Sequence, residues 1–347
     1  MAYTTIDNPE LYFQTKIYTG NGSTQSITLD GSEDMRPDWI WIKNRPSNRG
    51  HTLVDSVRGV SKTLESHTNG LEETHTNSIT SFDSDGFSLG NRNQTNANSE
   101  SFVSWNWLAG GSASSNSDGS ITSSVSANTT AGFSIVSYTG TGSAGTIGHG
   151  LGSAPSVIWT KTRSSNEQWF LHFSILGTGS FIKLDTTDAA GTNTTAFPFN
   201  PQASTFGLST DGATNTSGRT YIAYCFAEKK GYSKFGTYTG NGNSDGTFVF
   251  CGFRPAWVMI KRTDTTSDWN IMDNKRAVSV NPNTKELYAN SNQAEATGGQ
   301  TIRDYLSNGF KLRGTSGGTN ASGGTYIYMA FAESPFVNSN GVPTNAR

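Results

Sequence analysis

Cysteine and charge are both scarce in this chain of 347 residues. Its two cysteines, Cys225 and Cys251, are too few for a secreted scaffold held together by disulfides, and whether they pair depends on a distance that the sequence does not give. Charged residues are only 15% of the chain, and the net charge is −2. Since no excess of positive charge is available to meet phosphates, we expect no nucleic-acid partner.

Long apolar runs and runs of helix formers are missing as well. No stretch approaches the roughly 18 apolar residues of a membrane span, so we expect no membrane insertion. The first residues, Met1–Thr5, lack the basic and apolar segments of a signal peptide. We therefore expect synthesis in a cytoplasm, and release by another route such as lysis if the protein acts outside the cell.

The residues that are present indicate a β-rich, turn-rich protein. Glycine accounts for 39 residues, and serine, threonine and asparagine are abundant. Aromatic residues make up 11% of the chain, which supplies material for a core and argues against disorder. The length is enough for two or three domains.

A pentapeptide organises the chain. Tyr18-Thr19-Gly20-Asn21-Gly22 returns unchanged at 238–242 and with one change, to Tyr-Thr-Gly-Thr-Gly, at 138–142. Each copy follows a short alternating stretch, and its two glycines allow a tight bend with positive φ. The domain-sized spacing predicts three copies of one domain.

The segments after each pentapeptide keep the same order. A proline-led apolar strand comes first (37–45, 155–163 and 255–262), then a middle strand such as 53–59, a Gly-Phe strand such as 86–90, and a closing strand. Six short strands per copy, separated by turn signals, predict an all-β fold of three tandem β-sandwich or jelly-roll-like repeats. Packing around a pseudo-threefold axis and a linear string both remain open.

The predicted boundaries follow from these segments. Asn8 as N-cap and Pro9 in the first position predict one helical turn before the first repeat. The stretch 110–131 is rich in Ser, Gly and Asn and predicts a linker. The full division is an N-terminal segment 1–12, repeat 1 at 13–109, the linker 110–131, repeat 2 at 132–232, repeat 3 at 233–334 and a tail 335–347.

The closing strands indicate which face is the core. One face is large and apolar in every copy, and it consists of Val103, Trp105, Trp107, Ile222, Tyr224, Phe226, Ile327, Met329 and Phe331. The opposite face places Cys225 where the other copies have Asn106 and Ala330. We interpret Cys225 as a small residue at a packed site.

The proline-led strands carry the candidate contact residues. Their tryptophans favour core packing, with a sugar-stacking platform as the alternative, and the cations at their ends favour solvated or salt-bridged strand ends. Binding of an anionic glycan or bonding to a neighbouring repeat are the alternatives for these cations. The candidates for glycan or partner contact are Trp39, Trp41, Lys43, Arg45, Trp159, Lys161, Arg163, Trp257, Lys261 and Arg262.

Motifs for catalysis, cofactors and metals are weak. The glycine pattern at 140–145 is followed by residues that cannot open a helix, so we expect no dinucleotide cofactor. The aspartates at 83–86 and 185–188 offer too few oxygens for Ca²⁺ from one loop and indicate turns, although Ca²⁺ binding stays open. The five histidines lack zinc-ligand spacing, and no nucleophile elbow is present. Carboxylate pairs of a glycosidase meet only in space, so a glycan-degrading enzyme stays an alternative.

Several segments together resemble a family of uncharacterised repeat proteins of tailed bacteriophages, in particular marine phages that infect cyanobacteria. The segments that carry the resemblance are 13–16, the pentapeptides, 37–45, 55–59, 85–87, 329–333 and 340–343. Repeat 2 departs most from the pattern, with Ser156, Thr160 and Phe206-Gly207-Leu208.

The resemblance implies a virion structural protein, often tail-associated, and supplies no catalytic residues. We therefore expect a non-enzymatic tail fibre, spike or other host-contacting component, with a capsid decoration protein and a surface-glycan depolymerase as alternatives. The implied partners are other virion proteins, further copies of the chain in a homo-oligomer such as a trimer, and a glycan or receptor on the host surface.

Overall fold

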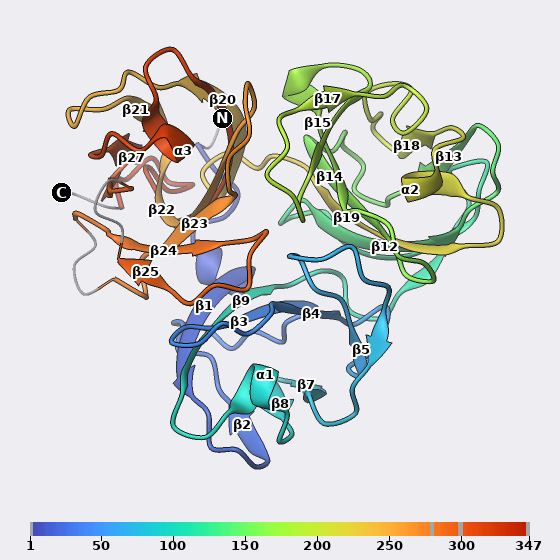
Figure 1. The fold of residues 1–347 in the computed structure, drawn as a ribbon, viewed down its shortest axis with the longest axis horizontal. Coiled ribbons are helices and arrows are strands. Elements are labelled where there is room, and N and C mark those ends of the chain that lie inside the picture. Colours follow the sequence, from blue (N-terminus) through green and yellow to red (C-terminus); the bar gives the residue numbers. More distant parts are fainter. Residues whose placement is uncertain (1–2, 278–280, 298–300, 345–347) are drawn as a thin grey trace.

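Strands and turns make up most of the fold, in agreement with the predicted all-β class. In the computed structural model, which describes residues 3–277, 281–297 and 301–344, strands account for 42% of the chain and helices for 5%. The strands form several antiparallel sheets. Figure 1 shows these sheets in three groups around a common centre. We call the groups lobe 1 (residues 13–109), lobe 2 (110–232) and lobe 3 (233–335).

Lobe 1 contains a larger and a smaller sheet. The larger sheet has the order β1-β9-β3-β4, with β1 at Phe13–Thr19, β9 at Ser101–Trp107, β3 at Trp39–Asn44 and β4 at Thr52–Asp55. The smaller sheet has the order β2-β8-β7, with β2 at Gln25–Ile27, β8 at Gly86–Leu89 and β7 at Ile79–Asp83. The 3-10 turn η1 (Pro9–Leu11) precedes the lobe, whose remaining elements are the pair β5 (Lys62–Thr63) and β6 (Glu73–Thr74) and the helix α1 (Asn93–Asn96).

Lobe 2 has the longest sheet, in the order β10-β11-β12-β19-β14-β15-β16-β17. Its strands are β10 (Ser114–Asn116), β11 (Ser123–Asn128), β12 (Phe133–Thr139), β19 (Thr220–Phe226), β14 (Val157–Thr162), β15 (Phe170–Phe173), β16 (Ser180–Lys183) and β17 (Gly191–Thr192). The other elements are β13 (Gly145–Gly148) paired with β18 (Thr205–Leu208), the 3-10 turn η2 (Ser174–Leu176) and the helix α2 (Gly212–Asn215).

Lobe 3 again contains a larger and a smaller sheet. The larger has the order β20-β28-β22-β23-β24-β25, with β20 at Ser233–Thr239, β28 at Thr325–Pro335, β22 at Phe253–Arg262, β23 at Asn270–Asp273, β24 at Lys285–Tyr288 and β25 at Ala296–Thr297. The smaller has the order β21-β27-β26, with β21 at Phe248–Phe250, β27 at Gly309–Leu312 and β26 at Arg303–Leu306. Its helix is α3 (Gly317–Asn320).

Two local predictions differ from the structure. The stretch 110–131, predicted to be a linker, contains β10 and β11, and β11 pairs with β12 along six residues. Strand β11 buries Ser123, Val125 and Ser126, and these small side chains let the polar segment add to a sheet edge. The middle strand predicted at 53–59 ends at Asp55, because the Asp55 carboxylate accepts hydrogen bonds from the backbone N–H of Val57 and Arg58 and turns the chain.

The turn predicted at Asn8–Pro9 is confirmed, with the Asn8 side chain accepting from Glu10 N.

The pentapeptide meets the short helix of its lobe. Tyr18 Oη donates to the Thr95 carbonyl at 2.7 Å, and Asn21 N donates to Asn96 Oδ1 at 2.9 Å. A side chain on Gly20 would overlap the Ala97 carbonyl oxygen, and Gly22 has a φ of 68°. The corresponding bonds in lobes 2 and 3 join Tyr138 to Thr214, Thr141 to Asn215, Tyr238 to Thr319 and Asn241 to Asn320. The first glycine is therefore needed for close approach and only the second for positive φ.

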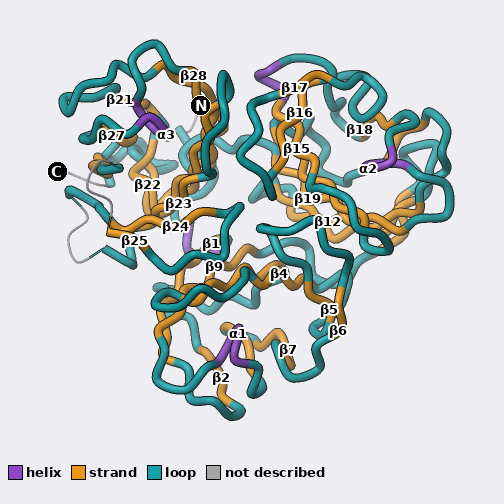
Figure 2. Tube along the Cα trace, in the orientation of Figure 1, coloured by secondary structure: helices purple, strands orange, loops and turns teal. Residues whose placement is uncertain are grey.

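Both faces of the proline-led strands are buried. Ile40 and Ile42 of β3 face the smaller sheet of lobe 1 and pack with Phe87 and Leu89. The predicted apolar face of the closing strands is confirmed as core, but it packs between lobes rather than inside one lobe. Figure 2 shows the consequence: strands of all three lobes line the centre, while the helices α1, α2 and α3 lie farther out in their lobes.

Candidate functional site

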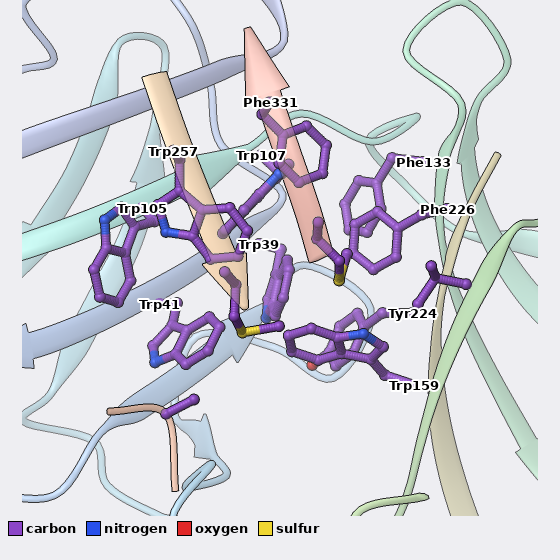
Figure 3. Packing of buried hydrophobic residues seen from close by; sticks show 14 of the residues in the cluster. Trp39, Trp41, Trp105, Trp107, Phe133, Trp159, Tyr224, Phe226, Trp257 and Phe331 are labelled. Carbon is purple, nitrogen blue, oxygen red and sulfur yellow. The ribbon is translucent and has the colours of Figure 1, made fainter. Parts of the chain in front are cut away.

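The candidate tryptophans meet at the centre of the molecule. Trp39, Trp41 and Trp257 are 0% exposed, and Trp159 is 1% exposed. Figure 3 shows their rings directed at one another from strands of different lobes. Trp39 lies 5.6 Å from Trp159 and stacks on Tyr224 at 4.5 Å, both in lobe 2. Trp107 of lobe 1 lies 5.8 Å from Trp257 of lobe 3.

This packing overturns the sugar-platform alternative for the four tryptophans. A sugar ring needs an exposed aromatic face, and these faces are covered by other side chains of the same apolar cluster. Fully burying one such side chain contributes about 3 kcal/mol. Core packing, the interpretation that the sequence favoured, is therefore the role of Trp39, Trp41, Trp159 and Trp257.

The three candidate lysines are buried too, and their ammonium groups donate to backbone carbonyls. Lys261 Nζ bonds to Thr187 O of lobe 2 at 2.9 Å, and Lys161 Nζ bonds to Asn69 O of lobe 1 at 3.3 Å. Lys43 Nζ bonds to Asn44 O at 2.7 Å. Burial lowers the pKa of Lys43 to about 7, and the pKa of Lys161 and of Lys261 to about 8.

Arg45 joins lobe 1 to lobe 3. Its guanidinium forms a two-pronged ion pair with Glu295 at 2.8 and 3.0 Å, and Glu295 N donates to Arg45 O at 2.7 Å. Glu295 also accepts from Arg276, which is paired with Asp273 at 2.6 Å. Trp105 of lobe 1 completes the cluster by donating its indole N–H to Asp273 at 2.9 Å. Burial alone would lower the pKa of Arg276, but Asp273 and Glu295 outweigh it and raise that pKa.

Arg163 joins lobe 2 to lobe 1 in the same way. It pairs with Glu72 at 2.8 and 3.0 Å, and Glu72 N donates to Arg163 O at 2.9 Å. Glu72 also contacts Arg58, whose side chain is 0% exposed and is paired with Asp55 at 2.5 Å. Tyr224 of lobe 2 donates to Asp55 at 2.7 Å. We call these five residues the lobe 1–2 cluster, and Arg45, Trp105, Asp273, Arg276 and Glu295 the lobe 1–3 cluster.

The junction of lobes 2 and 3 keeps the backbone bond and replaces the charges. Ala190 N donates to Thr263 O at 3.0 Å, where the other junctions join Glu to Arg. Phe173 is the last residue of β15 as Asp55 is of β4, and Leu176 lies three residues later, as Arg58 does. Met329 occupies the place of Tyr224 on its closing strand. Phe173 and Met329 belong to the central apolar cluster, and Leu176 packs against it.

Arg262 does not share the position of Arg45 and Arg163. Thr263 takes that place, and Arg262 lies one residue earlier, near the surface, where it pairs with Asp264 at 2.7 Å. Of the two cations predicted at the end of β22, only Lys261 therefore corresponds to a cation of the other two strands. Because Arg262 directly follows Lys261, the sequence made the two look like the Lys-Arg pairs of the other strands.

A further anchor precedes each middle strand. Trp169 Nε1 of lobe 2 donates to Glu65 O of lobe 1 at 2.9 Å, and Trp269 Nε1 of lobe 3 donates to Lys183 O of lobe 2 at 2.8 Å. His51 of lobe 1 takes the third place, with Nε2 at 3.0 Å from Tyr288 O of lobe 3 and Nδ1 accepting from Trp41. Burial, with the nearby Lys43 and His67, lowers the pKa of His51 well below its ordinary value.

Sequence reasoning missed the carboxylates of these junctions. Glu72 and Glu295 each stand two residues before a threonine, in Glu72-Glu73-Thr74 and Glu295-Ala296-Thr297. This short Glu-x-Thr pattern is the sequence signal for the two glutamates, but so short a pattern is too common to identify them. The sequence also has Arg58 and Arg276 in similar contexts, three residues after Asp55 and Asp273, but it does not show their partners across the junction.

The other motifs form turns and packed sites. Asp83 accepts from Ser81 and Ser88 at 2.6 and 2.7 Å, as expected of a turn between strands. Cys225 and Cys251 are free and buried, which excludes the disulfide left open by the sequence. The glycine pattern at 140–145 leads into strand β13 and not into a helix, as the sequence predicted. In the described part of the chain, no helix has the length and apolar character to cross a membrane.

Comparison with known proteins gives a family and no function. Searches of the curated proteins and of the solved structures returned no match. A family model described as a domain of unknown function, DUF7483, matches residues 8–335, which begin at the N-cap of η1 and end with the last strand of lobe 3. The chain therefore belongs to the DUF7483 family.

Proposed function

We propose that the chain consists of three tandem β-sandwich repeats arranged with pseudo-threefold symmetry, and that it is a non-enzymatic structural protein of a tailed-phage virion. The larger sheets support the first part, since β1-β9-β3-β4, β12-β19-β14-β15 and β20-β28-β22-β23 have corresponding orders. Apolar clusters between the larger and smaller sheets of lobes 1 and 3 support a sandwich in each.

One observation carries the structural role. The two ion-pair clusters and the central tryptophans, which come from segments that recur along the chain, join lobe to lobe. Such a closed ring resists shear and holds the peripheral loops in fixed positions, which suits a rigid part of a particle. The resemblance to tail-associated phage proteins favours a tail fibre, spike or other host-contacting part.

Labelling of virions tests the location. An antibody against the purified protein, detected with gold particles in electron micrographs, is expected to mark the tail. Label on the head would instead support the capsid decoration alternative, and virions without label would remove the virion assignment. A blocking control with excess purified protein separates specific label from background.

Incubation with host surface polysaccharide tests the absence of catalysis. Release of oligosaccharides would establish the depolymerase alternative and defeat the non-enzymatic proposal. Light scattering tests the proposed homo-oligomer in the same preparation: a trimer has three times the chain mass of 37.2 kDa.

A further inference from the structure

Lobe 3 contains a polar cavity that the junctions do not use. It lies between α3 and the strands β23 and β24 and has a volume of ≈ 180 Å³. Its lining includes Ser267, Asp268, Asn270, Tyr288, Ser316 and Thr319.

The cavity has a fixed floor. Asn270 is 3% exposed and held on both sides, because its Nδ2 donates to Glu286 Oε2 at 2.6 Å and its Oδ1 accepts from Arg303. Tyr288 Oη donates to the other oxygen of Glu286 at 2.9 Å, which fixes the tyrosine ring in the wall. A buried carboxylate thus orders two lining side chains before any ligand arrives.

Several polar atoms in the wall of the cavity make no hydrogen bond, or only a long one, within the part of the chain that the structure describes. Asp268 Oδ1 accepts from Asn290 at 2.7 Å, while its Oδ2 has no partner among the residues that the structure describes. The Ser267 hydroxyl likewise makes no bond within the described part of the chain, and Ser316 Oγ accepts only a long bond of 3.3 Å from Gly318 N. One carboxylate oxygen and two hydroxyls are therefore free to bond to a guest.

In lobe 1, a side chain crosses the place that corresponds to this cavity. Gln94, the second residue of α1, donates to Glu65 at 2.5 Å across this space. In lobe 2, Phe170 and Phe181, stacked with ring centres 4.6 Å apart, take the places that Asn270 and Glu286 have in the floor of the lobe 3 cavity. In lobe 3, the second residue of α3 is Gly318, and a Cβ there would lie 3.2 Å from Ser267 Oγ. The absence of a side chain at Gly318 keeps the cavity open.

We propose that this cavity of lobe 3 binds one neutral sugar residue of a glycan. Sugar hydroxyls would donate to Asp268 Oδ2 and exchange bonds with the hydroxyls of Ser267 and Ser316, and the carbon face of the sugar ring would pack against Tyr288. The carboxylates of Asp268 and Glu286 disfavour an anionic guest. The proposal rests on the host-contacting function, which it narrows to recognition of a polyhydroxylated surface.

Saturation-transfer NMR on the full-length protein tests it, with glucose, galactose, mannose and N-acetylglucosamine as separate probes. At least one probe is expected to receive saturation from the protein. Gly318→Gln introduces glutamine at the position that Gln94 has in lobe 1. Its side chain is expected to fill the cavity and to abolish the signal. Asp268→Asn removes the charged acceptor and is expected to weaken binding about tenfold. Thr265→Gln, at an exposed position nearby, is the matched control and is expected to bind as the parent does.

Two outcomes would overturn the proposal: no transfer to any of the four sugars, or a signal from Gly318→Gln equal to that of the parent protein. Circular dichroism melting of Gly318→Gln guards against misfolding, since an unchanged melting temperature assigns the lost signal to the filled cavity. Tail labelling of virions is read independently. Tail label without sugar binding removes only the cavity proposal, and head label removes the host-contact function itself.

Discussion

Buried charge at two junctions, and its replacement at the third, defines the molecule at the scale of the residue. Removing one partner of a buried ion pair leaves the other uncompensated and typically costs 3–5 kcal/mol, whereas an apolar replacement of the whole set is often neutral. Asp55 and Arg58 have side chains that are 0% exposed, so this cost applies to them in full. The lobe 2–3 junction already has an apolar version with Phe173, Leu176 and Met329.

We therefore expect Asp55→Ala to lower the free energy of unfolding by about 3–5 kcal/mol. The triple variant with Asp55→Phe, Arg58→Leu and Tyr224→Met copies the apolar junction and is expected to recover most of that loss. Urea denaturation followed by tryptophan fluorescence measures both. A triple variant less stable than Asp55→Ala would show that the two junctions are not interchangeable.

Two histidines make the lobe 1–3 junction sensitive to acid. Burial, with the charge of Lys43, lowers the pKa of His67 to about 4, and the pKa of His51 is also lowered. Between pH 4 and the ordinary value near 6.5, the unfolded chain holds more protons than the folded chain, so stability falls as pH falls through this window. Glu65, whose pKa burial raises, offsets part of the effect.

We expect the free energy of unfolding to drop by about 1–2 kcal/mol per histidine between pH 7 and pH 5. His67→Asn is expected to flatten this dependence. His75→Asn, at an exposed hydrogen bond to Glu73, is the control and is expected to keep the parent slope. Denaturation at four pH values would refute the assignment if the slope of His67→Asn matched that of the parent.

At the scale of the element, hydrogen bonds from the pentapeptide turn connect the first strand of a lobe to its short helix. Helices of four residues have little stability of their own, so α1, α2 and α3 depend on such tertiary bonds. Asn96 supplies several of them: its Oδ1 accepts from Asn21 N, and its Nδ2 donates to the Gly90 carbonyl.

The substitution Gly20→Ala tests the close approach of the pentapeptide to the short helix, without the effect of a positive φ. The new methyl group would overlap the Ala97 carbonyl oxygen, so we expect a loss of at least 2 kcal/mol as the strand and helix move apart. Gly111→Ala is the control, because Gly111 has a φ of 75° with open space around it and is expected to lose only about 1 kcal/mol. Thermal melting compares the two, and equal losses would show that crowding at Gly20 is unimportant.

Local signals predicted elements well, and pairings across the molecule poorly. The run at 37–45 became β3, because a continuous stretch of strand formers is both locally favoured and buried on two faces. The polar strands β10 and β11 were missed, since their stability comes from an edge of another sheet rather than from their own residues. The same limit hid Glu72 and Glu295 as partners of Arg163 and Arg45, and it hid the cavity beside Gly318, which exists because a side chain is missing.

At the scale of the whole molecule, the central cluster makes the lobes interdependent. Tryptophans that would lie on the surface of an isolated lobe become fully buried when three lobes meet, as Trp39 and Trp257 do. An isolated lobe would expose this apolar face to water and lose its stabilisation. The lobes should therefore not unfold one at a time, although each has an apolar cluster of its own.

We accordingly expect a single calorimetric transition, with a van't Hoff enthalpy equal to the calorimetric enthalpy. Trp39→Ala removes the ring that contacts Tyr224 and Trp159 of lobe 2, and it is expected to cost about 3–5 kcal/mol and to lower that one transition by roughly 5 °C without splitting it. Ile175→Ala, at a side chain that is 54% exposed, is the control and is expected to leave the transition in place. If Trp39→Ala instead produced two transitions, with the later one at the parent temperature, the lobes would fold independently and the shared core would be a docking surface between finished domains.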